Sequence, residues 1–449
     1  MLEVLDGPPG DHLLQIPAGQ PFRLYLWHTL AKFLSDPDAE FLLDLVHAVP
    51  LWINEQLHPS PAWPIHAGVI STPEPLVVCH DSWKSASDHP SIVEDLIQEE
   101  LAAGFIALVP GGVPELQERY QRTAVGKLGP LGVVIAEGPS PRLVVDSSIS
   151  NVTSNTVIPN HMTLPRISDV IDCAPETMAR QQMIQRRILI DPKDGGMLCF
   201  HANGKLYRCI TLNFGARASG WYWGRVAGLM VRTSHALLAH GHALWQYVDD
   251  LLAWLDRISS PLWASHLVVL FLILGIPMSW HKAALDVEVD WIRWRISVLT
   301  WSISIPEEKF SKIVQQLHKM SKCTKAPLKD MQSLVGRLLW LTSGWHFLRP
   351  VLIPLYKAPH HIPTTMVGMD HVVFQQFLDT PSPQLTLSTD LTHRHQSSCQ
   401  QVKLVRVAHT HVQTLDDASK LNLKSRRVWI GIQDPTSPFR SIDDEVREA

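Results

Sequence analysis

The fold is decided by Ala243-Leu-Trp-Gln-Tyr-Val-Asp-Asp-Leu-Leu-Ala-Trp254, in which two adjacent carboxylates separate two runs of apolar, β-favouring residues. The first run ends at Val248 and the second begins at Leu251, so the sequence predicts a β-hairpin with Asp249 and Asp250 at its tip. Two carboxylates at one turn repel each other unless a cation neutralises them. Mg²⁺ is the natural candidate because it prefers hard oxygen ligands and is often shared with substrate phosphates. A surface turn with two solvated acids is the alternative.

The composition is that of a folded protein without a strong overall charge. The chain has 449 residues, of which 45% are hydrophobic and 18% charged, enough for several subdomains around a large core. The net charge is −4, so any surface that binds nucleic acid must be local. These properties favour a globular protein over a disordered tail.

The sequence also predicts where the protein is located. Six cysteines are scattered without a C-x-x-C pair, and the N-terminus lacks the pattern of a signal peptide. The most apolar run, Leu267–Ile276, is too short to span a bilayer and predicts a buried helix. We therefore expect an intracellular protein, cytoplasmic or nuclear, that is not secreted and has no membrane partner.

Tyr247-Val248-Asp249-Asp250 resembles the catalytic hairpin of retroelement reverse transcriptases, which are RNA-directed DNA polymerases, and other segments follow in the order of that family. The strand predicted over Pro141–Asp146 is similar to the family's finger strand, in which Arg142 matches the arginine that contacts the triphosphate. A guanidinium suits phosphate oxygens. Lys127 is the match for a second basic residue. An ordinary surface ion pair is the alternative role for Arg142.

The resemblance implies that Asp191 is a third metal ligand. Asp191 ends the apolar run Ile188–Ile190, and this segment is similar to the family's first catalytic motif. Only Pro192–Gly196 separate Asp191 from the next apolar run, Met197–Phe200, which indicates an internal deletion. The bulky side chain that the family packs beneath the nucleotide sugar is missing there. The resemblance therefore also implies impaired catalysis.

Two further motifs resemble the nucleotide site of the family. Leu212–Gly215 is similar to the turn that positions the template base and the nucleotide, so Phe214 and Gly215, together with Tyr247, are predicted nucleotide contacts. A glycine allows the backbone to approach a substrate closely. Leu274–Lys282 is similar to the motif whose lysine acts near the leaving pyrophosphate. Lys282 would be a proton donor or charge stabiliser, and a surface lysine is the alternative.

Residues 306–360 carry a local excess of positive charge. They hold nine Lys and Arg residues against three Asp and Glu, while the rest of the chain is acidic. Two amphipathic helices are predicted in this range, the first starting with a capping box from Ser304 to Glu307. A basic helical unit resembles a polymerase thumb that holds the backbone of a duplex. A solvated helix face is the alternative.

The resemblance implies an α+β, right-hand polymerase fold with an antiparallel palm sheet, fingers and a helical thumb. We expect a helix from Leu164 to Arg187, a capping box from Ser91 to Glu94, and a type I′ hairpin at Asn203-Gly204. The expected domains are an N-terminal extension or linker (1–90), fingers and the start of the palm (91–173), palm (174–305), thumb (306–360), and a connection or ribonuclease H-like remnant with a polar tail (361–449).

The implied function is nucleotide addition by a reverse transcriptase from a retroviral-like or tyrosine-recombinase-type retrotransposon. Asp191, Asp249 and Asp250 would hold two Mg²⁺ ions, or Mn²⁺ in their place, while a primer on an RNA or DNA template is extended with deoxynucleoside triphosphates. One alternative is a decayed polymerase that binds nucleic acid without catalysis. The other is an interaction protein with a chance Asp-Asp turn.

Overall fold

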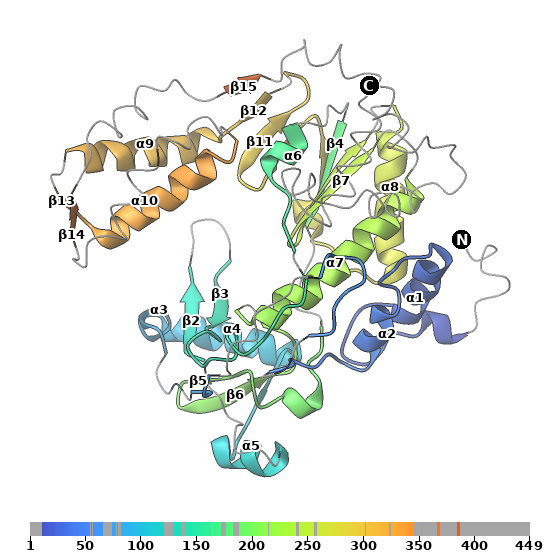
Figure 1. The fold of residues 1–449 in the computed structure, drawn as a ribbon, viewed down its shortest axis with the longest axis vertical. Helices are drawn as coiled ribbons and strands as arrows, with labels where there is room; N and C mark the ends of the chain where they lie inside the picture. Colours follow the sequence, from blue (N-terminus) through green and yellow to red (C-terminus); the bar gives the residue numbers. More distant parts are fainter. Residues whose placement is uncertain are drawn as a thin grey trace.

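The fold is taken from a computed structural model of the chain. It describes residues 11–53, 55, 57–65, 74–77, 79, 82–120, 129–135, 140–160, 162–171, 177–182, 188–213, 215–238, 242–255, 258–300, 302–322, 325–344, 352, 366–368 and 384–386. The chain forms both helices and strands (Figure 1), and the paired strands of the described residues are antiparallel, as in an α+β fold.

The centre of the fold is an antiparallel four-stranded sheet, here called the central sheet. Its order is β7-β8-β4-β9, and its strands are β7 (Ala243–Tyr247), β8 (Asp250–Leu255), β4 (Thr177–Gln182) and β9 (Ala284–Asp286). Side chains alternate between the two faces of a strand. Leu244, Leu251 and Ala253 accordingly belong to one core cluster, whereas Trp245, Leu252 and Trp254 belong to another.

The first face of the central sheet packs on two long helices, α7 (Arg217–Leu237) and α8 (Ser260–Leu274). Helix α8 ends at Gly275, which adopts the left-handed conformation that helix C-caps favour. The helix was expected to be buried, but Leu262, Val269 and Leu272 are about half exposed, so one side of it faces solvent. Among the described residues, no helix combines the length and apolar character needed to cross a membrane.

The second face is covered by a hairpin and a pair of helices. The elements are α6 (Ile167–Ile171), β10 (Glu288–Trp291), β11 (Trp294–Ser297), β12 (Ser302–Ser304), α9 (Glu307–Ser321) and α10 (Leu328–Leu341). Trp291 and Trp294 face each other across the β10–β11 turn and are fully buried, and the ring of Trp294 lies 4.9 Å from that of Trp340. These tryptophans therefore join α10 to the central sheet.

A second lobe lies below the central sheet in Figure 1. It contains α3 (Lys84–Ser87), α4 (Pro90–Ala102), α5 (Gly112–Tyr120), the hairpin β2 (Leu131–Val134) with β3 (Arg142–Val145), and the sheet β1 (Ile106–Leu108), β6 (Lys205–Cys209), β5 (Cys199–Ala202). Asn203 and Gly204 both have positive φ at the β5–β6 turn, so the predicted type I′ hairpin is confirmed.

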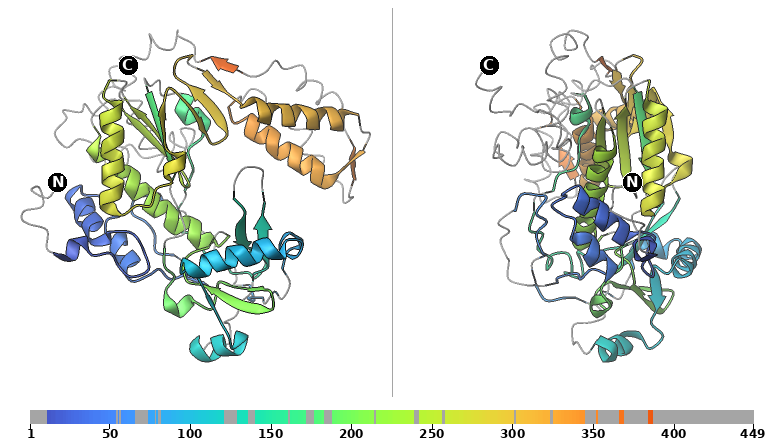
Figure 2. Two further views of the ribbon diagram at one scale, coloured as in Figure 1. Left: turned by 180° about the vertical axis from the view of Figure 1, so that it is seen from behind. Right: turned by 90° about the vertical axis from the view of Figure 1, so that its right-hand side faces the viewer.

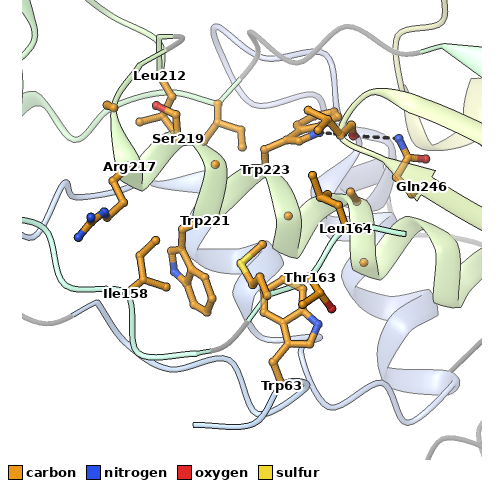
Figure 3. Close-up of a pocket in the computed structure, with 18 of the residues that line it drawn as sticks. Trp63, Ile158, Thr163, Leu164, Leu212, Arg217, Ser219, Trp221, Trp223 and Gln246 are labelled. Atoms are coloured by element: carbon orange, nitrogen blue, oxygen red, sulfur yellow. Dashed lines mark hydrogen bonds between the residues drawn. The ribbon is translucent and has the colours of Figure 1, made fainter. Parts of the chain in front are cut away.

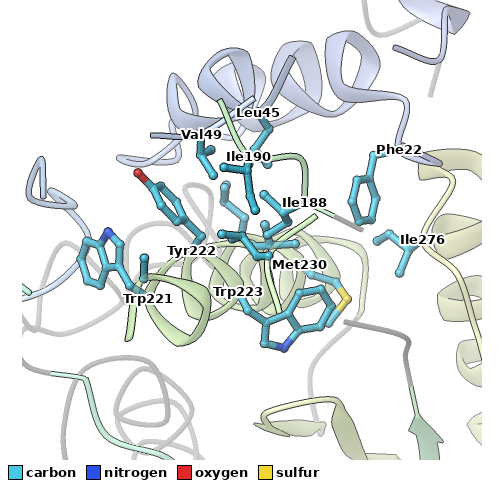
Figure 4. Close-up of a cluster of buried hydrophobic side chains, with 14 of the residues drawn as sticks. Phe22, Leu45, Val49, Ile188, Ile190, Trp221, Tyr222, Trp223, Met230 and Ile276 are labelled. Atoms are coloured by element: carbon cyan, nitrogen blue, oxygen red, sulfur yellow. The ribbon is translucent and has the colours of Figure 1, made fainter. Parts of the chain in front are cut away.

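The N-terminal segment packs against α7 and α8 (Figure 2). This segment consists of η2 (Asp11–Leu14), α1 (Leu24–Phe33), α2 (Phe41–Val46) and the described residues up to Ile65. Figure 4 shows Val49 of this segment beside Ile188 and Ile190, with Tyr222 of α7 on the same cluster. Two buried ion pairs add to the contact, Asp36 with Arg232 and Asp38 with Arg225. The segment expected to be an extension thus contributes to the main core.

Three local predictions are wrong. The helix expected from Leu164 to Arg187 does not form as one element: α6 covers Ile167–Ile171, and Thr177–Gln182 is instead strand β4 of the central sheet. The two capping boxes do not form either. Helix α4 starts at Pro90 after His89, helix α9 starts after Pro306, and neither cap has a side-chain hydrogen bond. Pro90 is the first residue of α4 and Pro306 is the N-cap of α9, two positions where the missing N–H of proline is no loss.

The remaining short strands extend the arrangement. Strand β15 (Gln384–Thr386) pairs with β12, and β13 (Lys325–Pro327) pairs with β14 (Met366–Gly368) between α9 and α10. Most of the segment expected to be a connection or ribonuclease H-like remnant lies outside the described residues.

Candidate functional site

The predicted hairpin forms, but its two-residue loop lies one residue earlier than the sequence indicated. Tyr247 pairs with Asp250, so the loop consists of Val248 and Asp249, and Asp250 is the first residue of β8. Val248 has φ of 56°, a conformation that is unfavourable for a β-branched residue. Such strain persists only where neighbouring groups hold the backbone in place.

Two side chains hold the strained turn from beneath. The carbonyl oxygen of Val248 accepts hydrogen bonds from the indole Nε1 of Trp223 at 2.6 Å and from the Nε2 of Gln246 at 2.9 Å. On the other face, Trp291 donates from Nε1 to the carbonyl oxygen of Asp250 at 3.3 Å, and its ring meets that of Tyr247 edge to face. The position of Asp249 is therefore fixed by Trp223 and Gln246, which no sequence signal identified because their contact depends on tertiary packing.

Asp191 does not lie on the strand beside the Asp-Asp hairpin. Ile190 forms a bridge with Val49, and the backbone N–H of Asp191 donates to the carbonyl oxygen of Val49 at 2.8 Å. Its carboxylate accepts a hydrogen bond from the backbone N–H of Lys193 at 2.9 Å and caps the short 3₁₀ helix η3 (Pro192–Asp194). The prediction that Asp191 neighbours the hairpin is wrong, because Asp followed by Pro starts a helical turn here.

Strand β4 occupies the position where the third carboxylate was expected. Gln182 pairs with Asp250, and the whole strand reads Thr-Met-Ala-Arg-Gln-Gln, without an acid. Within the described part of the chain, which includes Asp191, Asp249 and Asp250, no three His, Cys, Asp or Glu residues are grouped so that they could hold a metal ion. Two-metal catalysis needs carboxylates on both sides of the ions. The donor set therefore does not fit the two Mg²⁺ or Mn²⁺ ions that the resemblance implies.

Lys282 lies at the same end of the central sheet as the Asp-Asp pair. It is the last residue of η4 (Trp280–Lys282), directly before β9, and its side chain is exposed. Strand β9 pairs with β4, and β4 pairs with β8, so one strand separates Lys282 from Asp250. The structure thus brings Lys282 and the hairpin to the same end of the central sheet, with strand β4 between β9 and β8.

The other predicted nucleotide contacts are more dispersed. Arg142 is exposed at the start of β3, in the separate β2–β3 sheet. Gly215 has φ of 121°, and a Cβ there would lie 2.3 Å from the carbonyl oxygen of Val145, so this position needs glycine to pack on the end of β3. Lys127 and Phe214 lie outside the described residues.

Helices α9 and α10 lie side by side and project from the β10–β12 sheet toward the side of the β2–β3 hairpin (Figure 1). Their buried side chains belong to the second core cluster. Their exposed surface carries five basic residues: Lys312, Lys319, Lys322, Lys329 and Arg337. Lys312 forms an ion pair with Glu308 at 2.8 Å. The surface keeps a positive excess.

Neither a protein-family model nor a curated protein matches this sequence. Solved structures of a foamy viral protease–reverse transcriptase are similar in fold. The form termed dRH, in complex with double-stranded DNA, has a TM-score of 0.50 and 14% identity over 84% of this chain and 62% of that chain. A complex with an RNA/DNA hybrid has a TM-score of 0.47 and 16% identity, and the match covers 78% of this chain and 45% of that chain. Another complex with double-stranded DNA has a TM-score of 0.48 and 15% identity, and the match covers 78% of this chain and 69% of that chain.

The likeness establishes a reverse-transcriptase-like fold for this chain. At 14% identity it concerns the fold alone, and the chain spans about three-fifths of the length of the first of these proteins.

Proposed function

We propose that this chain is a nucleic-acid-binding protein with a reverse-transcriptase-like fold that holds a base-paired duplex but does not add nucleotides. The proposal that the chain adds no nucleotides rests on the sequence and position of strand β4. It pairs with the Asp-Asp strand at the position of the expected third ligand and has no carboxylate. The duplex-binding half is supported by the fold and by the basic surface of α9 and α10.

Without a third carboxylate beside Asp249 and Asp250, the site lacks both a negative charge and a ligand that would hold the metal ions in position. In a two-metal reaction the ions activate the attacking hydroxyl and neutralise the leaving group, and both effects depend on ligands held within fractions of an ångström. With Gln182 opposite Asp250, the hairpin contributes two carboxylates and the neighbouring strand contributes none. Loss of orientation alone reduces rates by orders of magnitude.

Duplex binding needs only a positive surface of suitable shape. The foamy viral dRH protein, which is similar in fold, was solved in complex with double-stranded DNA. In this chain, exposed Lys322, Lys329 and Arg337 lie on the paired helices, which would serve as the thumb. Lysine and arginine contacts to phosphates release counterions, so the proposed binding is strongly dependent on salt.

Salt dependence tests the binding surface. The affinity of a labelled DNA duplex and of an RNA/DNA hybrid is measured by fluorescence anisotropy over a range of salt concentrations. Reversal of Lys322, Lys329 and Arg337 to Glu should reduce the slope of log affinity against log salt by up to about 2.7, since each lost phosphate contact contributes about 0.9. The control reverses Lys32, Arg119 and Lys205, which changes the net charge equally on other elements. Equal effects of both variants would contradict this surface.

RNA-directed DNA synthesis with Mg²⁺ or Mn²⁺ is the second candidate function, favoured by the intact Asp249-Asp250 turn and by Lys282 at the same end of the central sheet. Primer extension on RNA and DNA templates with deoxynucleoside triphosphates and either metal separates the two candidates. We expect the chain to extend a primer no faster than its Asp249→Asn variant. Extension well above that variant would establish a polymerase.

A further inference from the structure

A cavity of about 500 Å³ lies beneath the Val248 turn, with Trp63 and Trp221 along one side and Gln246 at the opposite side (Figure 3). Gly215 also lines it, so this cavity belongs to the site already described. Another cavity, of about 510 Å³, lies between α5, η3 and β6 and is here called the α5 cavity. Its volume is within the range of small-molecule sites. Helix α5 stands at the far end of the second lobe from α9 and α10 (Figure 1), so the proposed duplex surface leaves the α5 cavity unused.

The fold places an arginine on the sheet face that α5 covers. Arg208 lies on β6, the middle strand of the β1-β6-β5 sheet, where it pairs with Ala107 on one side and Cys199 on the other. Side chains alternate between the two faces of a strand, so Arg208 shares its face with Leu206. Leu206 belongs to the small core cluster that contains Leu116 of α5. The side chain of Arg208 therefore lies on the α5 side of the sheet and lines the α5 cavity.

The guanidinium of Arg208 is unpaired. Among the described residues it has no hydrogen-bond or ion-pair partner, and its Nε is buried. Burying part of an unpaired charged group is costly. Its Nη1 and Nη2 are not buried to this degree, so an anion in the cavity can reach them. Such an anion would offset the charge of the whole guanidinium.

Two further donors stand near Arg208. A Cβ added at Gly195 would lie 2.6 Å from the hydroxyl of Tyr120 and 3.3 Å from Nη1 of Arg208, so both groups approach the same point of the wall. Lys193 of η3 also lines the cavity and is exposed. In the described part of the chain, neither the Tyr120 hydroxyl nor the Lys193 ammonium has a hydrogen-bond or ion-pair partner. Donors from α5, η3 and β6 thus meet at one cavity.

The charges at the α5 cavity suit a doubly negative group. Among the described residues that line it, three are cationic and none is acidic. Arg119 is paired with Glu115 at 2.7 Å, which leaves Arg208 and Lys193 to bind an anion. Asp191 is the neighbouring acid along the chain, and its carboxylate accepts from the backbone N–H of Lys193. A phosphate monoester carries a charge of about −1.5 to −2 at pH 7, which matches two unpaired cations.

We propose that the α5 cavity binds a phosphate monoester, the terminal phosphate of a larger molecule. Arg208 offers two donors in a fixed planar geometry, which suits two phosphate oxygens. Tyr120 and Lys193 donate to the phosphate from α5 and η3. Ile190 and Ile210 make the remaining wall apolar, so the molecule is recognised by its phosphate. This inference does not rest on duplex binding at α9 and α10.

Saturation-transfer NMR with phenyl phosphate tests the proposed chemistry. We expect transfer to the ring protons at about 1 mM ligand. Phenyl sulfate has the same shape but a single negative charge, so titrations should show binding that is weaker by about fivefold or more. Absence of transfer to phenyl phosphate would overturn the proposal, and so would equal affinity for the two ligands.

Arg208→Gln should weaken the binding of phenyl phosphate by about tenfold or more, because hydrogen bonds to a charged group are lost. Lys193→Gln should weaken it by about two- to fivefold. Lys193 is exposed, so this variant tests the cavity even if Arg208→Gln does not fold. Lys205→Gln is the matched control, because it removes the same charge from the same strand but on the opposite face. If Arg208→Gln and Lys193→Gln bind phenyl phosphate as tightly as the control does, the site is refuted.

The phosphate has two sources, the 5′ end of a nucleic-acid strand and a small phosphate ester. A thymine oligonucleotide with a 5′-phosphate is compared with the same strand ending in a 5′-hydroxyl as a competitor of phenyl phosphate. Displacement by the phosphorylated strand at about tenfold lower concentration than phenyl phosphate itself requires identifies the strand end as the occupant. Displacement at similar concentration identifies a small ester. Equal displacement by the hydroxyl strand would overturn recognition of a monoester.

The same variants separate this site from the proposed duplex surface. A duplex with 5′-hydroxyl ends should bind Arg208→Gln and Lys205→Gln equally, because both variants leave α9 and α10 unchanged. Failure of the α5 cavity and failure of the proposed function are therefore distinguishable.

Discussion

Arg232→Met should detach the N-terminal segment from α7. The guanidinium of Arg232 makes two hydrogen bonds to Asp36, from Nε at 2.6 Å and from Nη2 at 3.0 Å, and both side chains are 3% exposed. Removing one partner leaves a buried charge uncompensated, which costs about 3–5 kcal/mol. Local opening of residues 24–46 should then be faster by roughly a hundredfold to several thousandfold, since about 1.4 kcal/mol corresponds to a factor of ten.

Hydrogen exchange followed by mass spectrometry measures this opening on peptides from α1 and α2. The control is Arg295→Met. Arg295 makes the same two-bonded contact with Asp290, at 2.9 and 3.2 Å, but the side chains are 47% and 46% exposed, so the expected cost is at most about 1 kcal/mol. Relative to the unaltered protein, the increase in amide exchange rate in α1 and α2 of Arg232→Met should therefore be at least tenfold larger than the increase in β10 and β11 of Arg295→Met.

The double variant Asp36→Asn, Arg232→Met provides the rescue. Asparagine keeps the Oδ1 that accepts from the backbone N–H of Asp38 at 2.8 Å, and no charge is left buried at this pair. Most of the lost stability should return, because replacing both members of a buried pair is often neutral. If the single variant exchanges no faster than the control, or if the double variant is as unstable as the single one, burial of this ion pair does not hold the segment.

Three further outcomes follow from the same structure. Asn213→Leu removes two unpartnered buried polar atoms and should raise the free energy of unfolding by about 1–3 kcal/mol, measured by urea denaturation; a loss would contradict an unsatisfied amide. Trp223→Phe removes the 2.6 Å hydrogen bond to Val248 and should speed amide exchange at the hairpin turn by about three- to tenfold, whereas unchanged exchange would show that Gln246 suffices. Gln182→Asp should create Mn²⁺ binding detectable by electron paramagnetic resonance, and equal binding by the unaltered chain would contradict the misfit of the donor set.

Local pattern predicted those parts of the fold whose signal is contained in a few neighbouring residues. The hairpin at Val248-Asp249 is bordered by apolar runs on both sides, and Asn203-Gly204 is the preferred turn of a two-residue loop. The paired helices α9 and α10 show their apolar stripe in the sequence. These elements could be predicted without knowing which other parts of the chain they pack against.

Strand β4 is the opposite case. Thr-Met-Ala-Arg-Gln-Gln has no alternation of apolar and polar residues, so nothing local distinguishes Thr177–Gln182 from a helix. It is a central strand because β8 and β9 pair with its two edges, from about 75 and 105 residues further along the chain. Tertiary pairing outweighed the local propensity.

The misplacement of Asp191 follows from this missed strand. Ile188–Ile190 is a stronger strand signal than β4, and an acid, Asp191, follows it directly. We therefore expected this run to be the strand next to the Asp-Asp hairpin, where the structure has β4. One local signal argued against it, because Asp191 followed by Pro192 is the start of a helical turn. The N-terminal contacts with α7 were not predictable, since Asp36 and Asp38 reach arginines that lie nearly two hundred residues away.

The Asp-Asp pair itself distinguishes the two candidate functions most directly. If Asp249 and Asp250 hold no cation, they place two negative charges beside the phosphates of a duplex bound on the central sheet, and each should weaken binding. At 4–8 Å in water the repulsion of one unit charge is about 0.5–1 kcal/mol, so Asp249→Asn should strengthen duplex binding about two- to fivefold at low salt. The gain should be equal in Mg²⁺ and in a chelator. A polymerase that bridges the carboxylates to phosphates through metal ions would behave oppositely, because Asp249→Asn would lose affinity in Mg²⁺ and gain it only in the chelator. Anisotropy titrations under the two conditions give the sign of the change, and a loss confined to Mg²⁺ would refute the non-catalytic interpretation.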